Sequence, residues 1–96
     1  MKTVLVTRRI PDPGLAVLRQ RGFRTIVHAP DRPMTRSELL KGVARADGLL
    51  SQLVDRVDGA VFAAAPRLRV VANYAVGHDN IDKEAARARG VTVTNT

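Results

Sequence analysis

The sequence of 96 residues predicts an α/β fold, an open parallel sheet of five strands with helices between them. Short runs of valine, leucine and isoleucine recur along the chain, as in strands. Helix caps and helically spaced apolar residues occupy the intervals between these runs. The core must be aliphatic, because aromatic residues make up only 3% of the chain against 45% hydrophobic residues.

The five predicted strands are short apolar runs bounded by loop or helix signals. They are residues 2–7, 25–27, 48–51, 69–73 and 91–93. The run at 48–51, Gly-Leu-Leu-Ser, is typical of a strand buried on both faces.

The first two helices are predicted from their starting residues. Asp12 offers an N-cap with Pro13 in the first turn, and this helix is expected to end at Gly22. Thr35 and Glu38 have the spacing of a capping box, which predicts the start of the second helix.

The third and fourth helices have similar signals. We expect Asp55 to cap the third helix and Pro66 to stop it. The fourth is expected to begin at Asn80 or Asp82 and to end at Gly90.

Right-handed crossovers of this length place helices on both faces of the sheet, and we expect the flavodoxin-like strand order 2-1-3-4-5. The sequence ends at Thr96, directly after the fifth predicted strand. We therefore expect a truncated domain, with one sheet face left for another segment or a partner to cover.

Composition excludes several classes of function. The absence of cysteine excludes a disulfide scaffold and a thiolate metal site, and it fits a reducing compartment, so the cytoplasm is expected. No apolar run reaches the roughly 20 residues of a membrane span. The net charge of +7 comes from basic residues spread along the chain without interleaved aromatics, which argues against nucleic-acid binding.

Ligands of open parallel sheets bind at the carboxyl ends of the strands. Four candidate segments follow predicted strands, and they are residues 7–9, 28–30, 51–53 and 73–80. In the last segment, Gly77 would let backbone amides approach a carboxylate or phosphate. The alternative for Gly77 is an ordinary turn before a helix.

The stretch Val71–Asp82, VANYAVGHDNID, followed by Gly90–Thr96, GVTVTNT, resembles the D-2-hydroxyacid dehydrogenases, and most of all their glyoxylate and hydroxypyruvate reductases. The resemblance implies a two-domain enzyme that reduces a small 2-keto acid with NAD(H) or NADP(H), with the substrate between the domains. Residues 1–96 would be the N-terminal portion of the substrate-binding domain, and the cofactor-binding domain would be absent.

By the same resemblance, the backbone amides of Val76 and Gly77 hold the substrate carboxylate. Ala75 lies beside them, and Leu53 contributes an apolar wall. Backbone donors before a helix suit a small carboxylate.

The family's catalytic Arg, Glu and His would lie beyond Thr96. Neither His78 nor His28 takes their role. Family members often carry an aromatic residue in place of His78, and His28 stands at a strand end with no acidic partner nearby in sequence. The glycines show no G-x-G-x-x-G spacing, so no cofactor is expected to bind this chain tightly. Arg8 and Arg9 could steer an anionic substrate, although solvated loop arginines are more common.

Two other classes of function remain open. One is a stand-alone binding or regulatory module, but a phospho-acceptor receiver needs an Asp at the end of the third strand, where this chain has Ser51. The other is a fragment that self-associates through the exposed sheet face, without catalysis.

Overall fold

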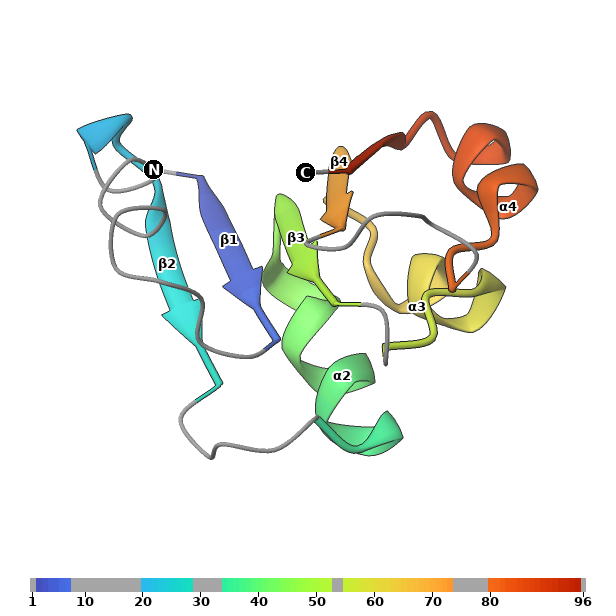
Figure 1. Cartoon of the computed structure of the whole chain (residues 1–96), viewed down its shortest axis with the longest axis horizontal. Coiled ribbons are helices and arrows are strands. Elements are labelled where there is room, and N and C mark those ends of the chain that lie inside the picture. The colour runs from blue at the N-terminus through green and yellow to red at the C-terminus, as the bar shows by residue number, and fades with distance from the viewer. Residues whose placement is uncertain (1, 8–19, 29–33, 53–54, 74–79, 96) are drawn as a thin grey trace.

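The computed structural model describes residues 2–7, 20–28, 34–52, 55–73 and 80–95. Five parallel strands form one sheet in the order β2-β1-β3-β4-β5, which confirms the predicted fold class and strand order (Figure 1). The strands are β1 Thr3–Val6, β2 Arg24–Val27, β3 Gly48–Ser51, β4 Val70–Asn73 and β5 Thr92–Asn95.

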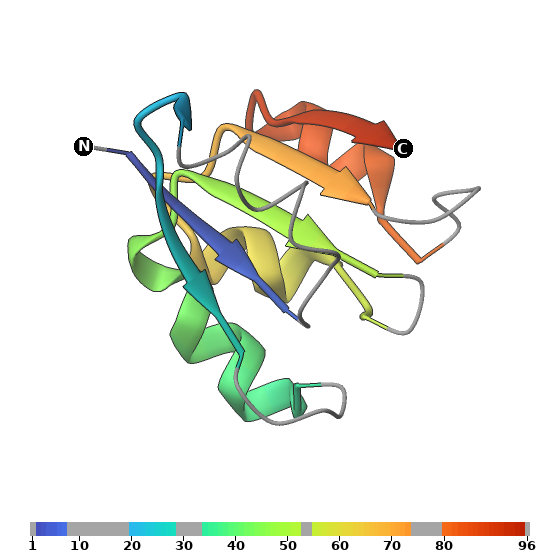
Figure 2. The same ribbon diagram turned by 60° about the vertical axis from the view of Figure 1, so that its left-hand side comes forward.

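The described helices lie together on one face of the sheet (Figure 2). They are α2 Arg36–Gly42, which continues into the 3-10 helix η1 Val43–Arg45, then α3 Gly59–Ala64 and α4 Lys83–Ala88. The helix predicted from Asp12 to Gly22 falls mostly outside the described residues. The described residues do not show whether a helix covers the opposite face of the sheet.

The main core lies between this sheet face and the three helices. Leu5, Leu49 and Val71 are aligned across β1, β3 and β4 by the strand register, and each is at most 3% exposed. Phe62 of α3 packs in the same cluster and is one of the largest fully buried side chains. A smaller cluster on the opposite face is built on Val4 and Val6.

Two predicted helix starts are confirmed in detail. Thr35 accepts a hydrogen bond from the Glu38 amide at 3.2 Å, and the Glu38 side chain accepts one from the Thr35 amide at 2.8 Å. This reciprocal pair is the capping box predicted for α2. Asp82, one of the two candidates for α4, caps that helix by accepting from the Ala85 amide at 3.1 Å.

The prediction that Asp55 caps the third helix is wrong. Helix α3 begins at Gly59, and Asp58 is its N-cap. The reason is that Val57 forms a parallel bridge with Ile81 instead of entering the helix. The Val57 amide donates to the Asn80 carbonyl at 2.9 Å, and the Asp82 amide donates to the Val57 carbonyl at 2.9 Å. The helix therefore starts after this extended segment.

Candidate functional site at the carboxyl edge of the sheet

The three inner strands change from apolar to polar residues at their carboxyl ends. Thr7 directly follows β1, Ser51 ends β3 and Asn73 ends β4. All three are fully buried, with 0% exposure. Because the strands are parallel, these residues lie at the same edge of the sheet, where an open α/β sheet binds ligands.

A side-chain amide pair connects the end of β4 to the start of the α4 segment. Asn73 Nδ2 donates to Asn80 Oδ1 at 2.8 Å. Ser51 Oγ donates to Asn73 Oδ1 at 2.9 Å, which ties the pair to β3. Asn73 and Asn80 are the residues that flank 74–79, so the two ends of that segment are held together.

Asn80 also reaches the turn that follows β3. Its Nδ2 donates to the Asp55 carbonyl at 2.7 Å and to the Gln52 carbonyl at 3.1 Å. Gln52 and Asp55 flank 53–54, so one amide group contacts both ends of this second segment.

Asp55 closes the same turn from its other side and is only 5% exposed. Its Oδ2 accepts from the Gln52 amide at 2.8 Å, and the Asp55 amide donates to the Gln52 carbonyl at 2.9 Å. The same oxygen accepts from Thr7 Oγ1, which connects the turn to the end of β1. Thr7, Ser51, Gln52, Asp55, Asn73 and Asn80 therefore form one connected group, here called the edge network.

The hydrogen bonds that define the edge network join its members to one another, as in a structural support. Each predicted ligand residue lies outside the described residues: Leu53, Ala75, Val76 and Gly77. Arg8, Arg9 and His78 lie outside them too. The structure describes the residues from which three of the four predicted loops begin, namely 7–9, 51–53 and 73–80.

His28 stands at the remaining predicted loop, residues 28–30, which follows β2. Its backbone amide donates to the Val6 carbonyl at 2.9 Å. Its Nε2 atom is buried and has no hydrogen-bond partner among the described residues. A general base is normally oriented by a partner, so this geometry supports packing for His28.

The perturbed carboxyl groups lie in surface ion pairs instead of the edge network. A hydrogen bond from the Arg36 side chain lowers the pKa of Asp58 below its ordinary value of 3.8. A hydrogen bond from the Thr3 amide lowers the pKa of Asp47, with a further contribution from Arg67. Both shifts stabilise charged carboxylates that hold the ends of helices and strands, and neither points to proton transfer.

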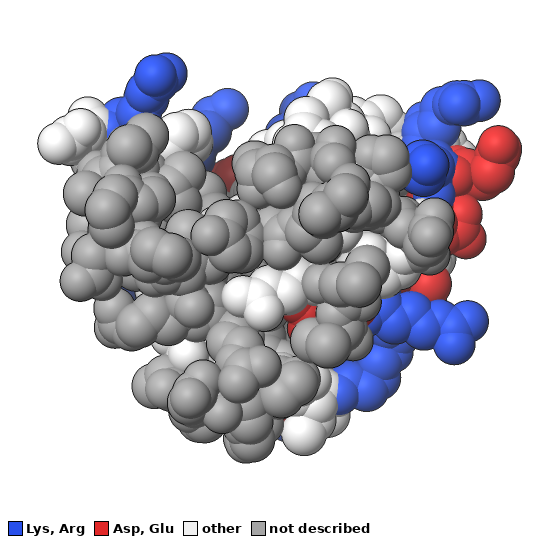
Figure 3. All heavy atoms as spheres, viewed as in Figure 1, with Lys and Arg blue, Asp and Glu red and all other residues white. Residues whose placement is uncertain are grey.

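The charged surface is mixed where it is described. Figure 3 shows basic side chains at separate places around the rim of the view, with acidic side chains beside them near α4. This dispersed pattern gives no support to a nucleic-acid interface. No helix in the described ranges is long and apolar enough to cross a membrane.

Two of the glycines that the structure describes are packed inside the fold. Gly42 and Gly48 lie against neighbouring side chains: an added Cβ would lie 2.9 Å from Leu5 Cδ2 at Gly42 and 3.4 Å from Val4 Cγ2 at Gly48. Neither lies in a turn from a strand end into a helix, where a phosphate-binding loop is built. The described residues likewise contain no cluster of His, Asp and Glu that could hold a metal ion.

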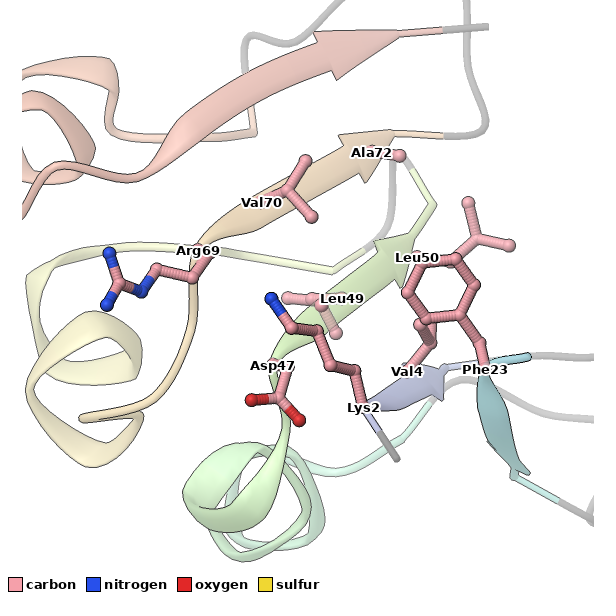
Figure 4. A pocket seen from close by; sticks show the side chains of 10 residues that line it. Lys2, Val4, Phe23, Asp47, Leu49, Leu50, Arg69, Val70 and Ala72 are labelled. Atoms are coloured by element: carbon pink, nitrogen blue, oxygen red, sulfur yellow. The ribbon is translucent and has the colours of Figure 1, made fainter. Parts of the chain in front are cut away.

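A groove of about 280 Å³ lies on the sheet face opposite α2, α3 and α4 (Figure 4). Phe23, Leu50, Val70 and Ala72 line it with apolar atoms, and Val70 is 39% exposed. Charged side chains lie at one end of the groove, and they are Lys2, Asp47 and Arg69.

A parallel sheet with buried polar residues at its carboxyl edge is typical of ligand-binding α/β domains. Residues 4–96 match the family described as D-isomer specific 2-hydroxyacid dehydrogenase, catalytic domain, and the chain belongs to this family. It is 50% identical over 93 residues to glyoxylate reductase of Thermococcus kodakarensis, covering 97% of this chain and 28% of that protein. Glyoxylate reductase of Pyrococcus furiosus is 48% identical over the same length and is covered to 27%.

Solved structures agree with the sequence relatives. The TT0316 protein of Thermus thermophilus superposes with a TM-score of 0.90 at 45% identity, over 95% of this chain and 29% of that one. A putative D-isomer specific 2-hydroxyacid dehydrogenase of Polaromonas superposes with a TM-score of 0.89 at 30% identity, over 97% and 29%. The chain thus spans between a quarter and a third of the length of these relatives.

The edge network is not evident in the sequence. There Asp55 and Asn80 look like helix caps, and Ser51 looks like the end of a strand. One signal was available, because polar residues end three adjacent strands of a sheet whose order was already predicted. The partners of Asn80 at Gln52 and Asp55 are backbone carbonyls, which carry no mark in a sequence.

Proposed function

We propose that this chain is the N-terminal portion of the substrate-binding domain of an enzyme that reduces a small 2-keto acid, glyoxylate or hydroxypyruvate, to the D-2-hydroxy acid with NADH or NADPH. The observation that carries the proposal is 50% identity to a glyoxylate reductase over 97% of the chain. Absence of cysteine supports a cytoplasmic location as part of the same proposal.

The chain's own contribution is to bind and orient the substrate carboxylate. We assign this to the backbone amides of Val76 and Gly77, with Ala75 beside them and Leu53 as an apolar wall. Backbone N–H groups recognise a carboxylate by its shape and charge, and they suit a short segment that joins a strand to a helix. The edge network supports this assignment, since it holds both flanks of 74–79 and of 53–54.

The nicotinamide cofactor supplies hydride when it is bound, and its site is assigned to the remainder of the parent protein. The packed positions of Gly42 and Gly48 support that assignment. The catalytic Arg, Glu and His are assigned to the remainder as well. The 96-residue chain should therefore be inactive alone.

Two measurements test the proposal. The 96-residue chain should give no oxidation of NADH or NADPH with glyoxylate or hydroxypyruvate, whereas the full-length protein that contains it should. Turnover by the chain alone, or no turnover of any small 2-keto acid by the full-length protein, would contradict the assignment.

Carboxylate recognition is tested separately by NMR of the chain. Acetate should shift the amide resonances of residues 75–77, and acetamide, which is nearly the same shape but neutral, should leave them in place. Equal shifts with both compounds would contradict binding through charge.

We also propose, as a second candidate, that the chain self-associates through the groove of Figure 4. Exposed Val70 and the apolar lining favour this, and the charges at one end are of both signs, so Lys2 or Arg69 of one copy can face Asp47 of another. Sedimentation should show a concentration-dependent dimer that Val70→Lys abolishes. A monomer at every concentration would refute this candidate.

A further inference from the structure

We infer that Asn80 is a positioning residue that fixes the residues flanking 53–54 relative to those flanking 74–79, the two segments proposed above to bind the carboxylate. The inference rests on the proposed function for the identity of the ligand. Its structural content is independent of that function, because it concerns which backbone groups one side chain holds together.

The geometry gives Asn80 contacts on both segments. Its Oδ1 accepts from Asn73 Nδ2 at 2.8 Å, which joins the two ends of 74–79. Its Nδ2 donates to the carbonyls of Gln52 and Asp55, at 3.1 and 2.7 Å, which are the two ends of 53–54. One side chain thus donates to both ends of 53–54 and accepts from the far end of 74–79.

The backbone strengthens this coupling. The Asn80 carbonyl accepts from the Val57 amide at 2.9 Å, so main chain and side chain both tie the start of the α4 segment to the strand-like stretch after Asp55. Displacing Asn80 would therefore move the flanks of both segments together. A substrate held by amides on one segment and an apolar wall on the other would lose both contacts in a single change.

The partners of Asn80 make the amide group hard to replace. Its Nδ2 faces two carbonyl oxygens, and its Oδ1 faces an NH2 group. In Asn80→Asp the shape is preserved, but the oxygen replacing Nδ2 would face two acceptors with no proton between them. Partly buried polar groups left in this state are strongly unfavourable, so the flanks should separate or rotate.

A merely structural role for Asn80 predicts a different outcome. If Asn80 only satisfied buried polar groups, its loss would lower the stability of the domain. Any effect on the KM for the keto acid would then be matched by an equal effect on the KM for the cofactor. Thr35→Ala provides the matched control, because it removes the cap of α2, a helix that contains no member of the edge network, and should cost about 1 kcal/mol.

The test compares Asn80→Asp with Thr35→Ala in the full-length protein. For Asn80→Asp we expect the KM for the 2-keto acid to rise by roughly 10-fold, the loss expected for a displaced hydrogen-bonded contact, with the KM for NADH or NADPH changed less than about 2-fold. Thr35→Ala should change neither constant. Equal KM effects for keto acid and cofactor, or no KM effect in Asn80→Asp, would overturn the inference.

A readout that needs no activity separates this inference from the proposed function. Amide hydrogen exchange of the 96-residue chain should show faster exchange at 52–55 and at 73–80 together in Asn80→Asp, and at neither segment in Thr35→Ala. Faster exchange confined to 80–82 would overturn the coupling. An inactive wild-type enzyme with coupled exchange would instead overturn only the identity of the ligand.

Discussion

Replacing Leu49 with alanine tests whether the sheet face beneath α2, α3 and α4 carries the stability of the domain. Leu49 is 1% exposed in the middle of β3 and lies between Leu5 and Val71 in the strand register. Leu→Ala changes at such positions cost about 2–5 kcal/mol, because apolar contacts are lost and a cavity remains. A chain of this size has a total stability of about 5–14 kcal/mol. We therefore expect a loss of about 3 kcal/mol, a large share of the total.

Urea denaturation followed by circular dichroism gives the measurement, and Val70→Ala is the matched control on the neighbouring strand. Val70 is 39% exposed and points to the opposite face, so its truncation should cost less than about 1 kcal/mol. With a slope near 1 kcal/mol per molar, Leu49→Ala should lower the midpoint by about 3 M. A shift no larger than that of Val70→Ala would refute the account of the core.

Three further predictions address the caps, the charges and one turn. Thr35→Ala should lower stability by about 1 kcal/mol, seen as a lower Tm of several degrees, and an unchanged Tm would contradict the capping box. The pKa of Asp58 is lowered mainly by Arg36, so its contribution to stability is complete above the ordinary value of 3.8 and is lost as pH falls through the lower folded pKa. In Asp58→Asn the free energy of unfolding should therefore fall less steeply as the pH is lowered through the acid range. An unchanged pH dependence would contradict this account. Gly90 has a φ of +70°, so Gly90→Ala should cost about 1 kcal/mol or more, whereas Gly59→Ala, in α3 with open space around it, should be neutral or stabilising.

The fold was predictable because its signals are local and agree with one another. Strand β3 at Gly48–Ser51 has the predicted bounds, and the capping box at Thr35 marks the start of α2. The third helix start was misplaced because a nonlocal bridge between Val57 and Ile81 competes with the local capping signal of Asp55. Asp55 and Asp58 are both good helix caps. Local propensity alone does not indicate that a tertiary contact will prevent Asp55 from capping the helix.

The candidate site was predictable as a place but not as a set of contacts. The strand order and the rule for parallel sheets identify the carboxyl edge, and Thr7, Ser51 and Asn73 are found there. The contacts of Asn80 depend on the backbone carbonyls of Gln52 and Asp55, which are distant from it in sequence. Packing determines where those carbonyls lie, and in the sequence Asn80 looks like one more helix cap.

The abrupt change of polarity along the inner strands has a physical meaning. In β1, β3 and β4 the residues aligned at Leu5, Leu49 and Val71 are apolar, yet two positions further along come Thr7, Ser51 and Asn73, equally buried. An apolar set of similar volume at that level would avoid the desolvation of these polar groups at little cost in stability. Stability therefore does not explain their presence. Directed hydrogen bonds do, since apolar contacts cannot fix where a departing backbone segment begins, whereas an amide or carboxylate with specific partners can. The polar edge is thus best understood as the part of the core that sets where the chain leaves the inner strands.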